Sequence, residues 1–118
     1  MAVMVVYVTT GDAAEALGIG RAVVAARLAA CANILSGMRS VYRWQGKVQD
    51  TDEAVLVLKT TEAQLEPLIA RVKALHSYDC PCIEALPVTG GYQPFLDWVA
   101  QETQGSPAGE SDGLSDGG

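Results

Sequence analysis

The sequence predicts one α+β domain, with secondary structure in the order strand, helix, strand, strand, helix, strand, helix. The chain has 118 residues, and compact domains cluster near about 100 to 150 residues. Hydrophobic residues make up 49% of it, which excludes a disordered chain and is high for a small monomer. Apolar runs with the alternating pattern of strands are interspersed with stretches that have the helical period of about 3.6 residues. One fold must therefore carry the function.

The first strand and helix are predicted from a valine-rich run and the turn that follows it. Residues 3–9 are apolar and end at a glycine-containing turn, which is typical of a buried strand. Asp12 is a favourable N-cap for a helix over residues 13–30. Gly18 and Gly20 weaken a helix, so we expect a close approach of its backbone to the sheet there. Six residues share one stripe and form the predicted buried face: Ala13, Leu17, Gly20, Val24, Leu28 and Cys31.

A long hairpin is predicted next. Residues 31–44 alternate in the manner of a strand, and Gly37 is expected to introduce a bulge or bend. A turn at 45–47 leads to a returning strand over residues 48–60, whose centre is a run of valine and leucine. The returning arm also contains a polar stretch at 49–53.

The second helix is predicted over residues 62–76. Thr61 and Gln64 have the spacing of a capping box. Pro67 would cost about 3 kcal/mol inside a regular helix, so we expect a kink or irregular first turns. Five apolar residues recur at helical spacing and predict an amphipathic helix: Leu65, Leu68, Ile69, Val72 and Leu75.

A fourth strand and a last helix complete the domain. Residues 82–88 read as a strand, and a proline at position 94 suits the first turn of a final helix. The first six elements have the βαββαβ order of the ferredoxin-like plait, which places both helices on one face of the sheet. The other face must be covered by the C-terminal helix or by a neighbouring subunit, and the surplus of apolar residues favours a neighbour.

Charge argues against a polyanion as the main partner. The chain has 8 basic and 14 acidic residues, a formal net charge of −6, which disfavours nucleic acid and anionic lipid. The first 100 residues contain 8 basic and 10 acidic residues, so much of the excess lies near the end. Residues 104–118 are rich in glycine, serine and acidic residues, a composition that does not fold. We therefore expect a domain at 1–103 and a disordered acidic tail at 104–118.

The expected location is the cytoplasm. The apolar run at residues 2–8 is far shorter than the roughly 20 residues that span a bilayer, and no basic segment precedes it. Three cysteines without a secretory signal fit a reducing compartment. We expect free thiols and no membrane partner.

The sequence offers no motif of an enzyme class in a suitable context. P-loop, nucleophile-elbow and zinc-protease patterns are missing from it, and Gly18-Ile19-Gly20 lies inside a predicted helix instead of a phosphate-binding loop. An acylphosphatase built on a plait would need an arginine in the first turn, and residues 9–12 contain none. We expect a protein that is not an enzyme and requires no cofactor.

One short segment has the residue types of a metal site. His76, Cys80 and Cys82 lie within seven residues, and imidazole with thiolates suits zinc or copper. Glu84 or Asp79 would be the fourth ligand. The plainer interpretation is a loop histidine followed by two small, half-buried thiols, and the spacing does not decide between the two.

Aromatic residues give a second candidate site. Their rings carry polar donors and suit the core and a subunit interface. Alternatively, the rings line a small-molecule cleft between subunits, beside Lys59 or Arg43. The residues are Tyr42, Trp44, Tyr78, Tyr92 and Trp98.

Five ordered segments of the chain resemble the CutA divalent-cation-tolerance family. The resemblance covers residues 3 to about 103 and leaves the tail outside. Its segments are residues 26–34, 40–47, 53–61, 76–81, and 86–88 with Trp98.

The resemblance implies a ferredoxin-like subunit in a homotrimer, in which the long hairpin of each subunit extends the sheet of the next. It also implies a cytosolic, non-enzymatic role in tolerance of copper and other divalent metals. The architecture is similar to that of the PII signalling proteins, so the alternative function is a PII-like sensor that binds a small molecule in the intersubunit cleft.

The chain departs from the family at the metal ligands suggested for it. Val8 stands where the family has a cysteine late in the first strand, Ser77 replaces a proline, and Cys82 replaces a glutamate. A copper site in this chain is therefore expected to be softer, built around His76, Cys80 and Cys82.

Overall fold

The computed structural model describes residues 2–104, and the predicted tail from residue 105 onward lies outside them. The fold is α+β, and the predicted order of elements is confirmed. The elements are β1 (Val3–Thr10), α1 (Ala13–Ala25), β2 (Cys31–Trp44), β3 (Lys47–Thr61), a 3-10 helix η1 (Glu62–Gln64), α2 (Leu65–Leu75), β4 (Ile83–Pro87) and α3 (Gln93–Glu102). None of the helices within residues 2–104 is long and apolar enough to cross a membrane.

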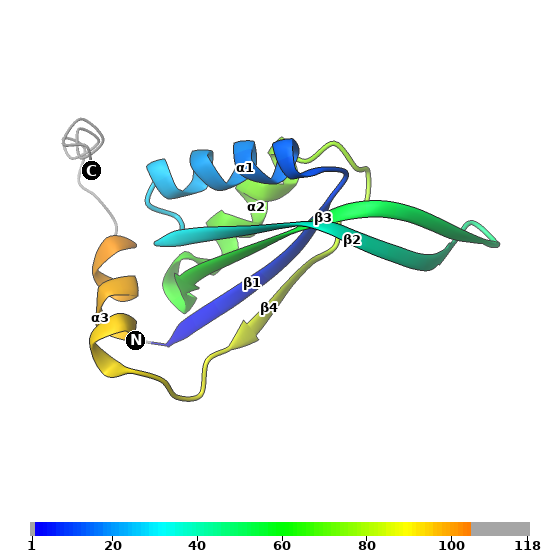
Figure 1. The fold of residues 1–118 in the computed structure, drawn as a ribbon. Coiled ribbons are helices and arrows are strands. Elements are labelled where there is room, and N and C mark those ends of the chain that lie inside the picture. Colours follow the sequence, from blue (N-terminus) through cyan, green and yellow to red (C-terminus); the bar gives the residue numbers. More distant parts are fainter. Residues whose placement is uncertain (1, 105–118) are drawn as a thin grey trace.

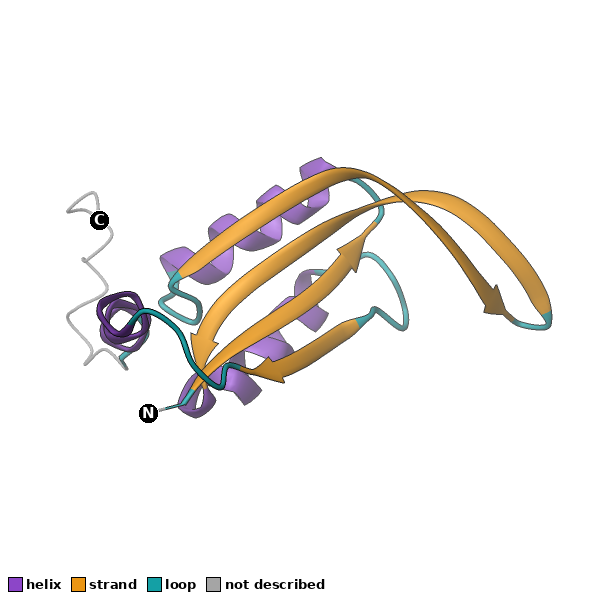
Figure 2. Cartoon of the chain, turned by 60° about the horizontal axis from the view of Figure 1, so that its bottom comes forward, coloured by secondary structure: helices purple, strands orange, loops and turns teal. Residues whose placement is uncertain are grey.

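The four strands form one antiparallel sheet in the order β2-β3-β1-β4. Helices α1 and α2 lie on one face of it, as the plait requires, while α3 lies at the end of the sheet farthest from the hairpin tip (Figure 1). The outer half of the β2–β3 hairpin curves away from the other strands (Figure 2).

The core fills the space between the sheet and its two helices. Alternate residues of the central strands point toward the helices and are fully buried, among them Val6, Val8, Leu56 and Leu58. Burial of each such side chain contributes roughly 1.5–3 kcal/mol. This one-sided core leaves the opposite face of the sheet, which carries the intervening residues, free of α1 and α2.

Helix α1 is shorter than predicted, and its buried face is shifted from the predicted stripe. Of that stripe, Gly20 is buried, and Ala13, Val24 and Leu28 are partly buried against the core. It ends at Ala25 instead of residue 30, because Arg27 adopts a left-handed conformation with φ of 62°. Leu17 of the predicted stripe is 40% exposed. The fully buried face consists of Ala16, Ile19, Gly20 and Val23.

The two glycines of α1 behave differently. A Cβ at Gly20 would lie 3.0 Å from the Cβ of Ala32 and 3.3 Å from Cδ1 of Leu56, which confirms the predicted close approach. A Cβ at Gly18 would meet no atom within 4 Å. The prediction was therefore wrong for Gly18.

The predicted capping box is not formed. Thr61 makes no capping hydrogen bond with its side chain, because it is the last residue of β3 and is paired with Val3. Gln64 Nε2 instead donates to the carbonyl oxygen of Thr103 at 2.9 Å. The irregular start predicted from Pro67 is confirmed: η1 precedes α2, and Pro67 is the third residue of α2, where the missing N–H costs no intrahelical bond.

The hairpin is paired along both arms, from Cys31 with Lys59 to Trp44 with Lys47, and its polar stretch belongs to β3. The register shifts between Leu35 and Met38. Gly37 lies in this shift with φ of 82°, which confirms the predicted bulge.

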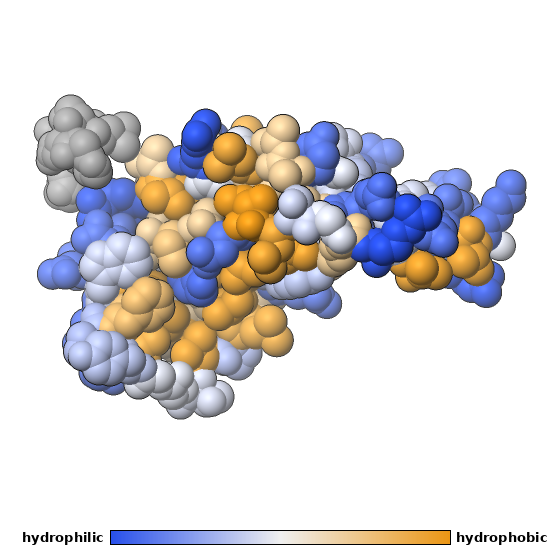
Figure 3. Space-filling view, viewed as in Figure 1, coloured by the Kyte–Doolittle hydropathy of each residue, from blue (hydrophilic) through white to orange (hydrophobic). Residues whose placement is uncertain are grey.

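Helix α3 covers only one end of the face opposite α1 and α2. Its Val99 is buried with Val3 and Ala30. Beyond this end, Leu35 and Leu86 are 60% and 53% exposed. Figure 3 shows apolar surface across the middle of the molecule. In the same view, Figure 1 places the strands there.

Candidate functional site

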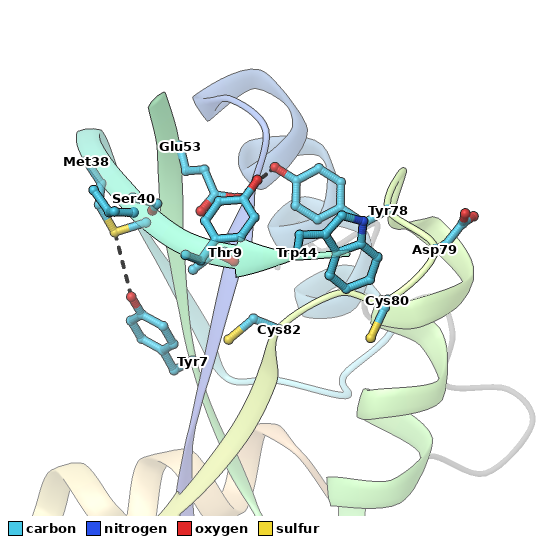
Figure 4. Close-up of a pocket in the computed structure, with 12 residues that line it drawn as sticks. Tyr7, Thr9, Met38, Ser40, Trp44, Glu53, Tyr78, Asp79, Cys80 and Cys82 are labelled. Atoms are coloured by element: carbon cyan, nitrogen blue, oxygen red, sulfur yellow. Dashed lines mark hydrogen bonds between the residues drawn. The ribbon is translucent and has the colours of Figure 1, made fainter. Parts of the chain in front are cut away.

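A cavity of about 650 Å³ lies beneath the curved hairpin, beside the end of β1. The hairpin bulge and the loop between α2 and β4 bring its walls together (Figure 4). The lining residues are Tyr7 and Thr9 of β1, Met38, Ser40, Val41, Tyr42 and Trp44 of β2, Glu53 of β3, and Tyr78, Asp79, Cys80 and Cys82 of the loop.

A buried carboxylate forms one wall of the cavity. Glu53 is paired with Met38 directly beyond the bulge and is only 8% exposed. The Tyr78 hydroxyl donates a hydrogen bond to Glu53 Oε2 at 2.7 Å. Burial raises the pKa of Tyr78, and the neighbouring Glu53 raises it further, so the phenol stays protonated and keeps donating.

His76 is engaged in bonds that hold the loop to the sheet. Its Nε2 lies 2.7 Å from the carbonyl oxygen of Thr9, and the backbone N–H of Tyr78 donates to its Nδ1 at 3.1 Å. These partners require a neutral imidazole with its proton on Nε2. The side chain is fully buried, and both ring nitrogens already have partners.

Glu15 of α1 supports the same loop. Its carboxylate accepts hydrogen bonds from the backbone N–H groups of Ser77 at 2.8 Å and Gly11 at 3.2 Å. Burial alone would raise the pKa of Glu15, but the hydrogen bonds from Ser77 and Gly11 outweigh it, and the pKa is lowered. Its Oε2 also lies 3.6 Å from Nδ1 of His76.

The two loop cysteines line the cavity as free thiols. Cys80 is exposed and Cys82 is half-buried. Cys82 Sγ donates to Glu84 Oε1 at 3.8 Å. Burial raises the pKa of Cys82, and the nearby carboxylate of Glu84 raises it further. This thiol is therefore neutral at neutral pH.

The single chain does not assemble the predicted ligand set. Among residues 2–104, no three or more histidine, cysteine, aspartate and glutamate side chains are placed to hold a metal ion. Cys80 and Cys82 share the cavity, whereas His76 does not line it. The assignment of these three residues as metal ligands stays a prediction.

Three of the five singled-out aromatic residues meet at the cavity, namely Tyr42, Trp44 and Tyr78. Tyr92 and Trp98 belong to the α3 region instead, where the rings of Phe95 and Trp98 are 5.7 Å apart.

The basic residues expected beside the aromatic cluster do not line the cavity. Lys59 Nζ donates to Asn33 Oδ1 at 2.6 Å. The cavity of the single chain thus has aromatic and acidic walls, and the place of Lys59 or Arg43 beside a cleft between subunits stays a prediction.

Sequence reasoning missed Tyr7 and Glu53. Tyr7 is the one aromatic residue of β1, and Glu53 is a carboxylate directly before the buried apolar run of β3. Both signals were present in the sequence. Their shared location follows only from the pairing of β1 with β3 and the curvature of the hairpin.

Comparison with known proteins gives a consistent result. The family model described as CutA1 divalent ion tolerance protein matches residues 4–102. The divalent-cation tolerance protein CutA of Thermus thermophilus is 46% identical over 99 residues, which cover 84% of this chain and 96% of that protein. The chloroplastic protein CutA of Arabidopsis thaliana is 44% identical over 86% of this chain but only 56% of its own length. The chain thus spans little more than half of that plant relative.

Solved structures agree in fold. The Thermus thermophilus protein superposes with a TM-score of 0.84 at 44% identity, covering 86% of this chain and 99% of that one. CutA1 from Oryza sativa superposes with a TM-score of 0.86 at 40% identity, covering 90% and 97%. The match of the family model at residues 4–102 takes in every element described above, including the hairpin and the loop that enclose the cavity. The chain belongs to the CutA1 divalent ion tolerance family.

Proposed function

We propose that the chain is a non-enzymatic protein of divalent-cation tolerance that binds copper or a similar soft ion through its cavity thiols. The observation that supports this is the placement of Cys80 and Cys82 on one cavity wall, with Cys82 Sγ 3.8 Å from Glu84 Oε1. Thiolates are preferred ligands of soft ions. A weak site is expected, because His76 would have to give up Thr9 or Tyr78 before it could join the other ligands.

The proposed assembly is a homotrimer in which each hairpin extends the sheet of its neighbour. Its support is the apolar surface that a single chain leaves open, on the sheet at Leu35 and Leu86 and on the hairpin at Val41 and Val48.

The proposed location is the cytoplasm. The relatives differ in this respect, because the Arabidopsis thaliana protein is named as chloroplastic and the similar structure from Archaeoglobus fulgidus is described as that of a periplasmic protein. Cell fractionation followed by detection of the protein in each fraction is therefore the test of this point.

The test of metal binding is a calorimetric titration of the intact protein with copper under reducing conditions. Cys82→Ser should abolish the binding heat, and His76→Ala should weaken it. Cys31→Ser is the matched control, because Cys31 is a half-buried thiol outside the cavity, and it should bind like wild type. Since burial raises the pKa of Cys82, binding must displace a proton and should tighten as the pH rises.

No uptake of copper or zinc by the wild-type protein would contradict the metal proposal. Equal losses in Cys82→Ser and Cys31→Ser would contradict the assignment of the cavity thiols.

A second candidate function is a sensor, of the kind that PII-like trimers represent, which binds a small organic molecule. The observation that favours it is a cavity of about 650 Å³ lined by aromatic rings from β1, β2 and the loop after α2, a volume typical of ligand pockets. A thermal-shift panel of metabolites on the intact protein tests it. A panel without a stabilising compound would contradict it.

A further inference from the structure

We propose that the cavity binds an organic ammonium cation, held by its aromatic rings and by the carboxylate of Glu53. This inference rests on the second candidate function, because it assigns a chemical class of ligand to the same cavity.

The cavity wall has the composition of a cation site. Its aromatic rings are those of Tyr7, Tyr42, Trp44 and Tyr78, and its lining includes no lysine, arginine or histidine. The face of an aromatic ring attracts a cation, and the attraction is stronger the further the cation is desolvated. A wall without a basic side chain offers no positive charge to an anion.

Glu53 is a buried acid without a cationic partner. It is 8% exposed, and the ion pairs formed within residues 2–104 do not include it. Its hydrogen bond from Tyr78 satisfies one of the several acceptor positions of a carboxylate. Burying an unpaired charge is costly, and a ligand cation would offset this cost. Asp79 is less suited to the role, because its carboxylate points away from the other labelled side chains (Figure 4).

Two hydroxyl groups of the wall are already occupied in ways that fix their rings. Tyr78 Oη donates to Glu53 Oε2, and Tyr7 Oη donates to Met38 Sδ at 3.7 Å (Figure 4). The rings are thus held before a ligand arrives, which lowers the entropy lost on binding.

The size of the cavity favours an organic cation over a bare ion. About 650 Å³ exceeds the space of a single dehydrated metal ion, and the aromatic rings of the wall are poor ligands for hard ions, which prefer oxygen. A quaternary or alkyl ammonium group has an apolar surface that packs against rings and a charge that pairs with Glu53. The formal net charge of −6 of the chain attracts cations from a distance as well.

The experiment is a calorimetric titration of the full-length protein with choline and, in parallel, with 3,3-dimethylbutan-1-ol, its neutral isostere of the same shape. Choline should bind, and the isostere should bind at least about tenfold more weakly, since it lacks the charge that the rings and Glu53 recognise. Tetramethylammonium should bind as choline does, and acetate should not bind.

Two variants and one control test the residues. Glu53→Gln keeps an acceptor for the Tyr78 hydroxyl but removes the carboxylate charge. It should therefore weaken choline binding at least about tenfold, because one charge contact is lost. Glu66→Gln removes the same charge from an exposed position of α2 and should leave binding unchanged. Trp44→Leu removes an aromatic ring from the cavity wall. Because Trp44 is 45% exposed, folding should be preserved. The variant should bind both choline and tetramethylammonium more weakly.

Equal affinity for choline and its isostere, or an undiminished affinity in both Glu53→Gln and Trp44→Leu, would overturn the assignment of an ammonium ligand. Stabilisation by neutral or anionic metabolites alone would also overturn it, while the sensor function would stand. If no compound binds, cations included, both the ammonium ligand and the sensor function are overturned.

Discussion

His76 ties one wall of the cavity to the central sheet. Its Nε2 bonds to the carbonyl oxygen of Thr9 at the end of β1, and its Nδ1 accepts from Tyr78, whose hydroxyl continues to Glu53. Its ring also stacks at a tilt on Tyr78, with 4.7 Å between centroids. A single imidazole thus positions the residue that fixes the buried carboxylate.

Replacing this imidazole should destabilise the protein. His76→Ala leaves the carbonyl of Thr9 and the N–H of Tyr78 without partners in a buried setting, and we expect a loss of about 2–3 kcal/mol in the free energy of unfolding. Urea denaturation at a fixed protein concentration measures it. His76→Gln, which retains a donor and an acceptor, should lose less. A His76→Ala protein as stable as wild type would contradict the structural role.

Glu15 should make stability depend on pH. Its pKa is lowered from about 4.5 by the hydrogen bonds from Ser77 and Gly11, so its contribution is fully present above about pH 5 and is lost as the pH falls through the lowered value. Glu15→Gln should cost about 1–2 kcal/mol at neutral pH, and its difference from wild type should shrink in acid. Denaturation curves from neutral to acidic pH measure this.

Glu66→Gln is the matched control for Glu15→Gln, because it removes an exposed carboxylate from the neighbouring helix. Both residues lie in the first turn of their helices, so Glu66→Gln should lose only the interaction with the helix dipole, about 0.3–1 kcal/mol, and no hydrogen bonds to a loop. A difference between Glu15→Gln and wild type that stays constant down to low pH would contradict the role of the carboxylate charge.

The packing of α1 on the sheet depends on which glycine faces it. Gly20→Ala would place a Cβ 3.0 Å from Ala32 and 3.3 Å from Leu56, and such overpacking costs about 1–3 kcal/mol, more than the gain in helix propensity. Gly18→Ala meets no atom within 4 Å and should stabilise by about 0.5–1 kcal/mol. Thermal unfolding of the two variants should give shifts of opposite sign. Shifts of the same sign would contradict the predicted difference in packing.

The sequence predicted the strands better than the helix ends. Alternation and the position of Gly37 located the hairpin and its bulge. The end of α1 was missed because Arg27, a residue without a chain-stopping signal, adopts the left-handed conformation. The capping box failed because Thr61 is retained by strand pairing with β1, a tertiary contact that local spacing cannot reveal.

The cavity was only partly predictable for the same reason. The short spacing of Cys80 and Cys82 pointed to the loop, whereas Tyr7 and Glu53 reach the cavity through long-range strand pairing. His76 was recognised as a chemically distinctive residue, but its buried hydrogen bonds depend on the placement of the loop against β1. Residue type identified the candidates, and only topology decided which of them face one another.

The sheet has one face with its own core and one face that is largely open. Helices α1 and α2 cover the first, whereas α3 covers only an end of the second. Apolar side chains such as Leu35 and Leu86 lie open on a single chain. Burying such a side chain contributes about 1.5–3 kcal/mol, which supports the proposed association through this face.

A charge on the open face should therefore break the proposed trimer and leave the fold of the subunit intact. Leu35 is 60% exposed in the single chain, so Leu35→Glu costs little within one subunit, but an interface would have to bury an unpaired carboxylate. Sedimentation equilibrium should give about three times 12.4 kDa for wild type and a lower mass for Leu35→Glu. Leu17→Glu, which places the same charge on the outer side of α1 at a residue 40% exposed, should stay trimeric. A monomeric wild type, or equal masses for the two variants, would contradict assembly through the open sheet face.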